Sequence, residues 1–274
     1  MRIVQISDTH ISVNHTDFAA NRAVLAEAIA GLKPDLIINT GDLAMNGCIE
    51  PADLSLAVEW HASLGTPVLS VPGNHDVGDR AEIRADQAVT DARIAQYRMM
   101  AGDDRWKRDI DGWRLIGLNA MLLGTGHTEE EAQFAWLAEA VATDAKIALF
   151  LHKPLFVDRP DEGPRGYWTV LPEPRRRLLA LLAGRDLKLV ASGHLHIARR
   201  LDLDGVTHIW GPAASFVCGD IQANLGGERR IGLVAYEFDA DGFTCQTVFP
   251  AGVTDWPLDP VIGRIYPSPQ STVA

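Results

Sequence analysis

The sequence predicts a single α/β domain in which two mixed or mainly parallel β-sheets pack together with helices outside them. Over the first two-thirds of the chain, short apolar runs alternate with amphipathic stretches, the pattern of parallel βαβ units. Later segments carry Asp-Gly between apolar runs, which indicates hairpins and a second, mixed sheet. No low-complexity linker or internal repeat divides the 274 residues, and 47% apolar content suffices for a sizeable core.

The opening half of the chain is expected to alternate strands with helices. Asp17 is the expected N-cap of the first helix, and Lys33-Pro34 is its stop. Apolar periodicity places strands at residues 2–7, 36–39 and 68–71, and helices at residues 18–32, 54–64 and 81–100.

The second half adds hairpins to this alternation. A capping box of Thr128 and Glu131 begins a helix that is expected to run to about Thr143, and Gly184 ends another helix. Hairpin turns are expected at Asp111-Gly112, Asp204-Gly205 and Asp241-Gly242. The remaining expected elements are strands at 106–110, 113–118, 147–151 and 187–191, and a helix at 175–183.

The end of the chain is rich in proline. Residues 250–274 contain Pro257, Pro260, Pro267 and Pro269, so we expect an extended tail that lies on the surface or on a partner. The sequence therefore predicts a folded domain at 1–249 and a C-terminal tail at 250–274.

Composition limits the classes of partner. The net charge of −11, from 36 acidic and 25 basic residues, repels a nucleic acid polymer, whereas a small anion is acceptable if metal ions supply positive charge. Three cysteines without a C-x-x-C pair indicate free thiols. Neither a secretory apolar segment nor a membrane span is recognisable, so we expect a cytoplasmic protein without membrane contact. The oligomeric state stays open, with a homo-oligomer included.

Polar residues follow five of the predicted strands directly. In open α/β sheets, ligands bind beyond the carboxyl ends of the strands, so these five clusters are expected to converge. In chain order the clusters are Asp8-Thr9-His10, Gly41-Asp42, Gly73-Asn74-His75-Asp76, His152-Lys153-Pro154 and Gly193-His194-Leu195-His196.

The residue types in these clusters are those of a metal site. Carboxylate, amide and imidazole ligands without thiolate suit Zn, Mn or Fe. Seven such side chains are too many for one tetrahedral ion, but they suffice for two ions if one carboxylate bridges. Each cluster alone is more often a turn or a cap, whereas five in order, each after an apolar run, indicate one site. The candidate metal ligands are Asp8, His10, Asp42, Asn74, His152, His194 and His196.

The five clusters resemble the signature of the calcineurin-like metallophosphoesterase superfamily over residues 8–196. The compact length, the Asp-Thr-His opening and the Asn-His-Asp ending resemble its branch of class III cyclic nucleotide phosphodiesterases and glycerophosphodiesterases. This resemblance implies a four-layer fold, a two-sheet sandwich flanked by helices. The residues after Asp220 match no part of the signature.

The resemblance also implies a role for each residue. One metal ion would be bound by Asp8, His10, Asp42 and His196, and the other by Asp42, Asn74, His152 and His194. The two ions, Fe, Mn or Zn, would lie about 3.5–4 Å apart and share an attacking hydroxide. His75 would contact a phosphoryl oxygen beside Asn74 and protonate the leaving alkoxide. Asp42 would act in catalysis as the bridge, and Asp76 would either orient His75 or structure its loop.

Four histidines lie outside the clusters. His61 and His127 are interpreted as surface residues, the first because it lies in an amphipathic helix. His15 follows the first cluster and is a candidate for the pocket, and the role of His208 stays open.

The segment 156–171 begins at the fourth cluster and has no periodicity, which is typical of a lid or binding loop. Arg159 or Arg165 could pair with phosphate, with Arg165 as the candidate for substrate binding, and Tyr167 or Trp168 could stack on a base. The alternative is a solvated loop whose aromatic side chains pack onto the core.

These features favour a dinuclear metal-dependent phosphodiesterase acting on a small phosphodiester of the cyclic nucleotide or glycerophosphodiester type. A phosphomonoesterase or pyrophosphohydrolase of the same fold is the alternative, because the core chemistry is shared. A DNA nuclease is disfavoured by the acidic balance. A non-catalytic scaffold would be expected to lose ligands, and here all seven are present.

Overall fold

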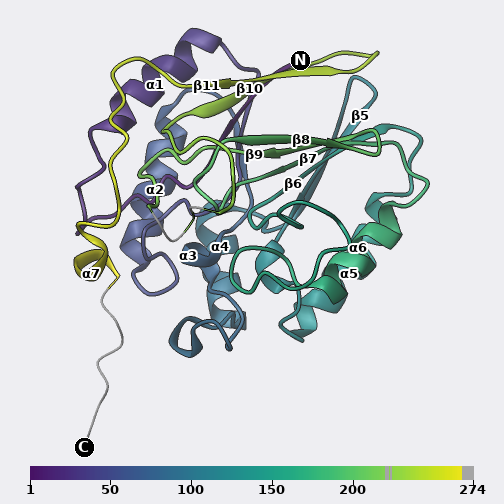
Figure 1. Cartoon of the computed structure of the whole chain (residues 1–274), viewed down its shortest axis with the longest axis horizontal. Helices are drawn as coiled ribbons and strands as arrows, with labels where there is room; N and C mark the ends of the chain where they lie inside the picture. Colours follow the sequence, from purple (N-terminus) through teal and green to yellow (C-terminus); the bar gives the residue numbers. More distant parts are fainter. Residues whose placement is uncertain (220–221, 223, 267–274) are drawn as a thin grey trace, which may run out of the picture.

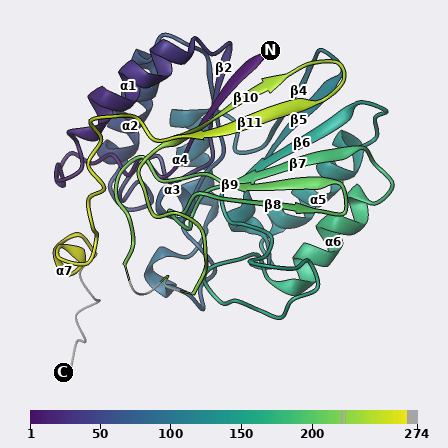
Figure 2. The same ribbon diagram turned by 45° about the horizontal axis from the view of Figure 1, so that its top comes forward.

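A computed structural model describes residues 1–219, 222 and 224–266 of the chain. Its strands form two sheets that pack face to face, with helices on both outer faces (Figures 1 and 2). This is the four-layer α/β sandwich that the sequence predicted.

The first sheet has the strand order β11-β10-β1-β2-β3. Its parallel part consists of β1 (Arg2–Ile6), β2 (Leu36–Asn39) and β3 (Val68–Ser70). The last hairpin, β10 (Leu233–Phe238) and β11 (Phe243–Val248), pairs antiparallel with β1. We expected the late hairpins to build a second sheet, and for this one that was wrong, because it covers the edge of β1 that would otherwise be unpaired.

The second sheet has the order β4-β5-β6-β7-β9-β8. Four parallel strands form its centre, and an antiparallel strand closes each edge. The hairpins predicted at Asp111-Gly112 and Asp204-Gly205 are both confirmed, since they join β4 to β5 and β8 to β9. In chain order the strands are β4 (Trp106–Ile110), β5 (Trp113–Leu118), β6 (Lys146–Leu151), β7 (Leu187–Ser192), β8 (Arg199–Leu203) and β9 (Val206–Trp210).

Side-chain alternation along the strands produces the layers. In β1, Ile3 faces the space between the sheets, where it packs in a cluster with Phe150 and Tyr236. The next residue, Val4, faces outward onto α1 (Asn21–Leu32). Leu149 of the second sheet faces outward onto α5 (Thr128–Ala140) and α6 (Pro172–Leu182). The remaining helices are α2 (Pro51–Ser63), α3 (Asn74–Val77), α4 (Asp91–Ala101), α7 (Ile262–Ile265) and the 3-10 turns η1 (Ala85–Gln87) and η2 (Ala120–Leu122).

Several predicted helix boundaries move, at α4 and α5 because a different residue caps the helix. The first helix begins at Asn21 rather than residue 18, and the carboxylate of Asp17 pairs with Arg264 instead of capping it. The helix predicted at 81–100 starts only at Asp91. The hydroxyl of Thr90 caps it by accepting a hydrogen bond from the backbone N–H of Arg93. The fifth helix is capped by the imidazole of His127 and ends at Ala140 rather than near 143.

In the part that the structure describes, the predicted C-terminal tail is folded. Leu258 and Ile265 are buried, and Ile262–Ile265 form the short helix α7. The expectation of an extended segment is therefore wrong for residues 258–266, since two apolar side chains there find a place in the core. Pro267 and Pro269 lie outside the described residues. Among the described helices, none is long and apolar enough to cross a membrane.

His61 is buried, so its interpretation as a surface residue is wrong. Its Nδ1 donates to the carbonyl of Ala57 at 2.7 Å, and its Nε2 accepts from the Asn39 amide, also at 2.7 Å. The other end of that amide accepts from the backbone nitrogen of Gly41 at 2.8 Å. His61 thus fixes Asn39, which shapes the end of β2 just before Asp42.

Burial lowers the pKa of His61 to about 4. The unfolded chain, with a histidine pKa of about 6.5, binds this proton first, so the stability that His61 supports is lost as the pH falls from 6.5 toward 4. Urea unfolding at pH 7 and pH 5 should show that the wild type loses about 2 kcal/mol more than His61→Gln, whose side chain does not titrate. Equal losses in the two proteins would contradict a neutral, buried His61.

Candidate metal centre

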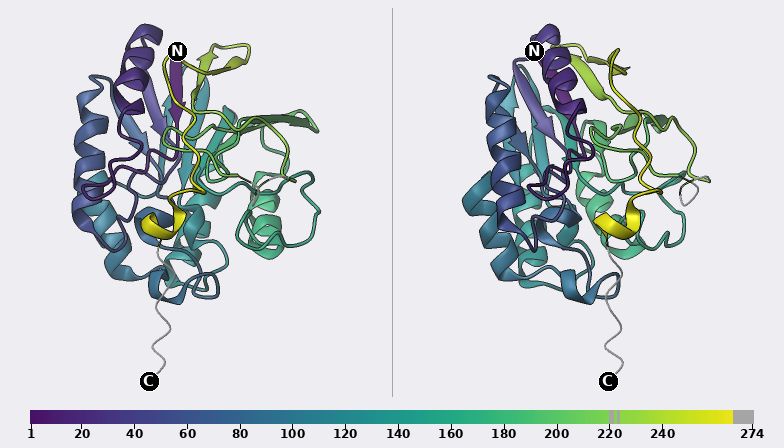
Figure 3. Two further views of the ribbon diagram at one scale, coloured as in Figure 1. Left: turned by 60° about the vertical axis from the view of Figure 1, so that its left-hand side comes forward. Right: turned by 90° about the vertical axis from the view of Figure 1, so that its left-hand side faces the viewer.

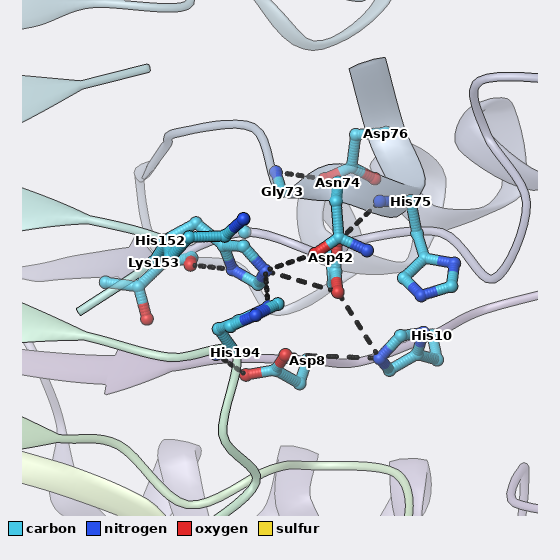
Figure 4. Close-up of polar contacts among 12 residues, drawn as sticks. Asp8, His10, Asp42, Gly73, Asn74, His75, Asp76, His152, Lys153 and His194 are labelled. Atoms are coloured by element: carbon cyan, nitrogen blue, oxygen red, sulfur yellow. Dashed lines mark hydrogen bonds and ion pairs between the residues drawn. The ribbon is translucent and has the colours of Figure 1, made fainter. Parts of the chain in front are cut away.

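The carboxyl ends of β1, β2, β3, β6 and β7 meet at one place, as the sequence predicted. Figure 4 shows Asp42, Asn74, His152 and His194 gathered closely, with Asp8 and His10 beside them. All seven candidate ligands are buried. Carboxylate and imidazole atoms gather in three overlapping groups, Asp8–His10–His196, His10–Asp42–His75 and Asp42–His152–His194, of which the first and the last consist of candidate ligands alone and are called the first and second groups.

The first group consists of Asp8, His10 and His196. Asp8 Oδ1 lies 3.3 Å from His196 Nε2 and 4.0 Å from His10 Nε2. The two Nε2 atoms lie 3.2 Å apart. Asp8 Oδ1 is buried and has no hydrogen-bond partner among the described residues, so this oxygen faces the space between the three side chains.

The second group consists of Asp42, His152 and His194. His152 Nε2 lies 3.2 Å from His194 Nδ1 and 3.3 Å from the amide oxygen of Asn74. Asn74 thus brings a neutral oxygen to the second group.

Asp42 lies between the two groups. Its Oδ2 is 3.2 Å from His152 Nε2 and 3.7 Å from His10 Nε2. Its Oδ1 accepts from the backbone nitrogen of His75 at 2.8 Å. One carboxylate oxygen therefore faces both groups while the other accepts a hydrogen bond from the backbone.

The outer nitrogens of three histidines are fixed by backbone carbonyls. His152 Nδ1 donates to Thr40 at 2.8 Å and His196 Nδ1 to Phe216 at 2.8 Å. His194 is turned the other way, and its Nε2 donates to the carbonyl of Tyr167 at 3.0 Å. In each case the inward nitrogen is left free to bind a metal ion, the usual arrangement of metal-binding histidines.

Five of the candidate ligands have a strained backbone conformation. Asp8, His10 and Asp42 have φ angles of 53°, 41° and 52°, and His194 and His196 have 69° and 52°. Residues with a Cβ rarely adopt this left-handed region, and such strain gathers at functional sites. Five of the candidate ligands share this strained conformation, which is consistent with a functional site.

The donor set fits metal ions. Burial lowers the pKa of His152, but the charge and hydrogen bond of Asp42 outweigh it and raise this pKa to about 9. Without metal, a proton is therefore held between Asp42 and His152 at neutral pH, and a bound cation would displace it. Two pairs of imidazole nitrogens face each other at 3.2 Å, and a bound cation would take the place of a proton between them.

Asp76 structures the loop and does not orient the imidazole of His75. Its carboxylate accepts from the backbone nitrogens of Leu43, Ala44 and Gly73 at 3.1, 3.0 and 2.9 Å. Burial and the charge of Asp42 raise its pKa to about 7. A side chain at Gly73 would collide with the carboxylate of Asp42, so the close approach of the two loops requires glycine there.

A cavity of about 270 Å³ opens onto the two groups. Tyr167 and Trp168 line it, which confirms that the 156–171 segment reaches the site, whereas Arg165 is not brought into it and pairs with Asp158 and Glu162. The described residues that line the cavity are His10, Asp42, Asn74, His75, Asp79, Ile83, Arg84, Gln87, Tyr167, Trp168, His194, His196, Phe216, Cys218, Gln222, Leu258, Ile262 and Tyr266.

The histidines outside the clusters do not line this cavity. His15 is half-buried on the far side of His10, His127 caps α5, and His208 packs on Phe156 in the core. The sequence analysis missed Phe216 and Tyr266, which lie outside the five clusters. Tyr266 is a single aromatic residue in a proline-rich segment, and no motif around it indicates a site.

Comparison with known protein families shows which family the chain matches. The family model for calcineurin-like phosphoesterases matches residues 1–198, which include all five clusters. The chain belongs to the calcineurin-like phosphoesterase family. As a member of this family it is a metallophosphoesterase, and therefore a hydrolase.

Two relatives of this calcineurin-like phosphoesterase are named as phosphodiesterases. A cAMP/cGMP dual specificity phosphodiesterase of Mycobacterium tuberculosis is 32% identical over 83% of this chain and 71% of its own. A probable glycerophosphodiester phosphodiesterase GpdQ of Arcobacter nitrofigilis is 28% identical over 72% of each chain.

Solved structures show the same fold at low sequence identity. A dimetal phosphatase from Danio rerio has a TM-score of 0.59 at 14% identity and covers 93% of this chain and 99% of its own. GAP50, the anchor in the inner membrane complex of Plasmodium, has a TM-score of 0.62 at 14% identity over 93% of this chain and 86% of its own. A phosphatase and an anchor share the fold, so the fold alone does not determine the activity.

Replacement of Asp42 tests the bridging position. Asp42→Ala removes one ligand from both groups, so the phosphoesterase should bind at least one metal ion fewer per chain and lose nearly all turnover. Elemental analysis of the purified variant, with wild type prepared in parallel, measures the first effect. A variant with two ions per chain and a near wild-type rate would refute the bridging role.

Proposed function

We propose that the protein is a dinuclear metal-dependent phosphodiesterase that hydrolyses small phosphodiesters of the cyclic nucleotide or glycerophosphodiester type. The observation that carries the proposal is Asp42, whose one free oxygen faces the imidazoles of His10 and His152. The names of these two relatives, a cAMP/cGMP phosphodiesterase and a probable glycerophosphodiester phosphodiesterase, support the substrate class. Location in the cytoplasm stays a prediction from sequence.

The charge of the cavity favours a diester over a monoester. Among the described residues that line it, Arg84 is the only arginine or lysine, and its guanidinium already pairs with Asp86 at 3.1 Å. The buried Lys153 nearby is paired with Asp79 at 2.7 Å. A monoester dianion would therefore depend almost wholly on the metal ions for charge compensation, whereas a diester carries one charge less.

The walls of the cavity are largely apolar beyond the ligands. Ile83, Trp168 and Phe216 lie on them, together with residues of the C-terminal segment. Such surfaces suit the organic groups that a small diester carries on both sides of the phosphate.

Two bound metal ions would supply Lewis acidity and an activated water for attack on phosphorus. The chain itself binds and orients the diester. The Asn74 amide nitrogen donates to the hydroxyl of Tyr167 at 3.2 Å, which fixes the direction of its oxygen toward His152. The two residues therefore set the edge of the site at which a phosphoryl oxygen would lie.

His75 is in position to exchange a proton with a leaving group. Its Nδ1 donates to the carbonyl of Met45 at 2.8 Å, so its Nε2 is the free nitrogen of a ring that lines the cavity. Burial lowers its pKa, against the raising effect of Asp42. A bound diester anion would raise this pKa again and so stabilise the imidazolium that acid catalysis requires.

A hydrolysis panel tests the substrate class. The manganese-loaded protein should cleave bis-p-nitrophenyl phosphate, cyclic AMP or glycerophosphocholine at least about tenfold better in kcat/KM than p-nitrophenyl phosphate. Chelation should abolish the activity, and Mn, Co or Zn should restore it, with Asp42→Ala as the inactive control. A preference for the monoester would support the phosphomonoesterase alternative, and a pyrophosphate substrate added to the panel tests the pyrophosphohydrolase.

Replacement of His75 tests the acid. A nitrophenolate leaves without much protonation, whereas a ribose or glycerol alkoxide does not. His75→Ala should therefore reduce kcat on the natural type of diester about 10–100-fold more than on bis-p-nitrophenyl phosphate. Equal losses on both substrates would mean that His75 positions the phosphate and does not protonate the leaving group.

A further inference from the structure

The C-terminal segment 254–266 is attached to the body of the domain along its length. The Asn21 side chain pairs with both backbone groups of Thr254, at 2.8 and 2.9 Å. Leu258 donates its backbone nitrogen to Val217 at 2.9 Å, and Arg264 pairs with Asp17. Figure 3 shows this segment crossing the domain to the side on which the helix α7 lies.

The segment ends at the first metal-ligand group. Tyr266 packs its ring at 5.0 Å from that of His75. Its hydroxyl lies 3.4 Å from His10 Nδ1 and 2.9 Å from the sulfur of Met45. The apolar residues before it, Leu258 and Ile265, share a cluster with Phe216 and Met45, so the ring is carried on a packed support.

His10 differs from the other three candidate histidine ligands. His152, His194 and His196 each donate their outer nitrogen to a backbone carbonyl. The outer nitrogen of His10 has the Tyr266 hydroxyl as its hydrogen-bond partner in the described part of the chain. The contact that a metal-ligand histidine needs on its second nitrogen is thus supplied by a side chain from the far end of the sequence.

We propose that Tyr266 is a positioning residue for the metal ligand His10, so that the C-terminal segment completes the metal centre. The hydroxyl accepts the Nδ1 proton of His10 and donates its own proton to Met45, which leaves His10 Nε2 unprotonated and aimed at Asp8 and His196. This inference rests on the metal centre proposed above but not on the identity of the substrate.

The matched pair of variants is Tyr266→Phe and Tyr167→Phe. Each removes one hydroxyl and keeps the ring, and Tyr167 contacts Asn74 of the second group instead of His10. We expect Tyr266→Phe to weaken Mn²⁺ binding at the Asp8–His10–His196 group about 10–100-fold, the usual effect of losing such a contact. Tyr167→Phe should leave that group unchanged.

The readout is metal binding to the stripped full-length chain, by calorimetric titration with Mn²⁺, with anomalous diffraction at limiting metal to show which group has lost its ion. Ile262→Ala, in the same segment but not in contact with His10, controls for loosening of the segment. An effect of Tyr266→Phe that Ile262→Ala does not share supports the proposal.

Wild-type affinity in Tyr266→Phe, an equal loss in Ile262→Ala, or a loss confined to the Asp42–His152–His194 group would overturn it. If the wild type itself binds fewer than two ions, the dinuclear centre fails instead, so the two failures are distinguishable.

Discussion

The carboxylate of Asp42 is the group on which the site depends. It is buried between two sets of imidazoles, with one oxygen held by the backbone of His75 and the other facing His10 and His152. A buried carboxylate without a cationic partner costs several kcal/mol even after the protein relaxes, roughly the scale of a domain's whole stability. Without metal, the proton on His152 gives Asp42 such a partner. Asp8 adds a second buried carboxylate, with one oxygen that has no hydrogen-bond partner among the described residues. Metal ions bound here would displace that proton and neutralise both carboxylates.

The fold makes this arrangement possible by ending parallel strands of both sheets at one edge. The loops can approach closely because Gly41 and Gly73 carry no side chain. A Cβ at Gly41 would lie 2.5 Å from the ring of His152. Behind this edge, the buried His61 holds Asn39, and Asn39 holds Gly41. These contacts lie directly behind Asp42, whose φ angle of 52° is one of the five strained ones.

The strand-end clusters were predictable because ligand chemistry and strand position are both local properties of the sequence. Asp8, Asp42 and His152 each follow an apolar run, and parallel strands bring such residues together without any further information. The layers followed from the same alternation. The late hairpin β10–β11 could not be assigned to the first sheet from the sequence. Its pairing with β1 depends on which of two distant strand edges it joins, and no local pattern decides this.

Other features of the site depend on contacts between residues far apart in the chain, which the local sequence does not reveal. His61 shares the buried face of α2 with Leu54 and Ala57, but histidine is a residue type with only an intermediate tendency to be buried, and its contact with Asn39 is not visible in the local sequence. The outer partners of His196 and His152 are backbone carbonyls, which carry no residue signal. Tyr266 reaches His10 only because Leu258 and Ile265 find room in a cluster with Phe216.

The central claim is that two ions lie on either side of Asp42, and anomalous diffraction from crystals saturated with Mn²⁺ tests it most directly. The account predicts two anomalous peaks, one among Asp8, His10, Asp42 and His196 and the other among Asp42, Asn74, His152 and His194. A single peak at saturating metal, or two peaks that do not share Asp42, would contradict it.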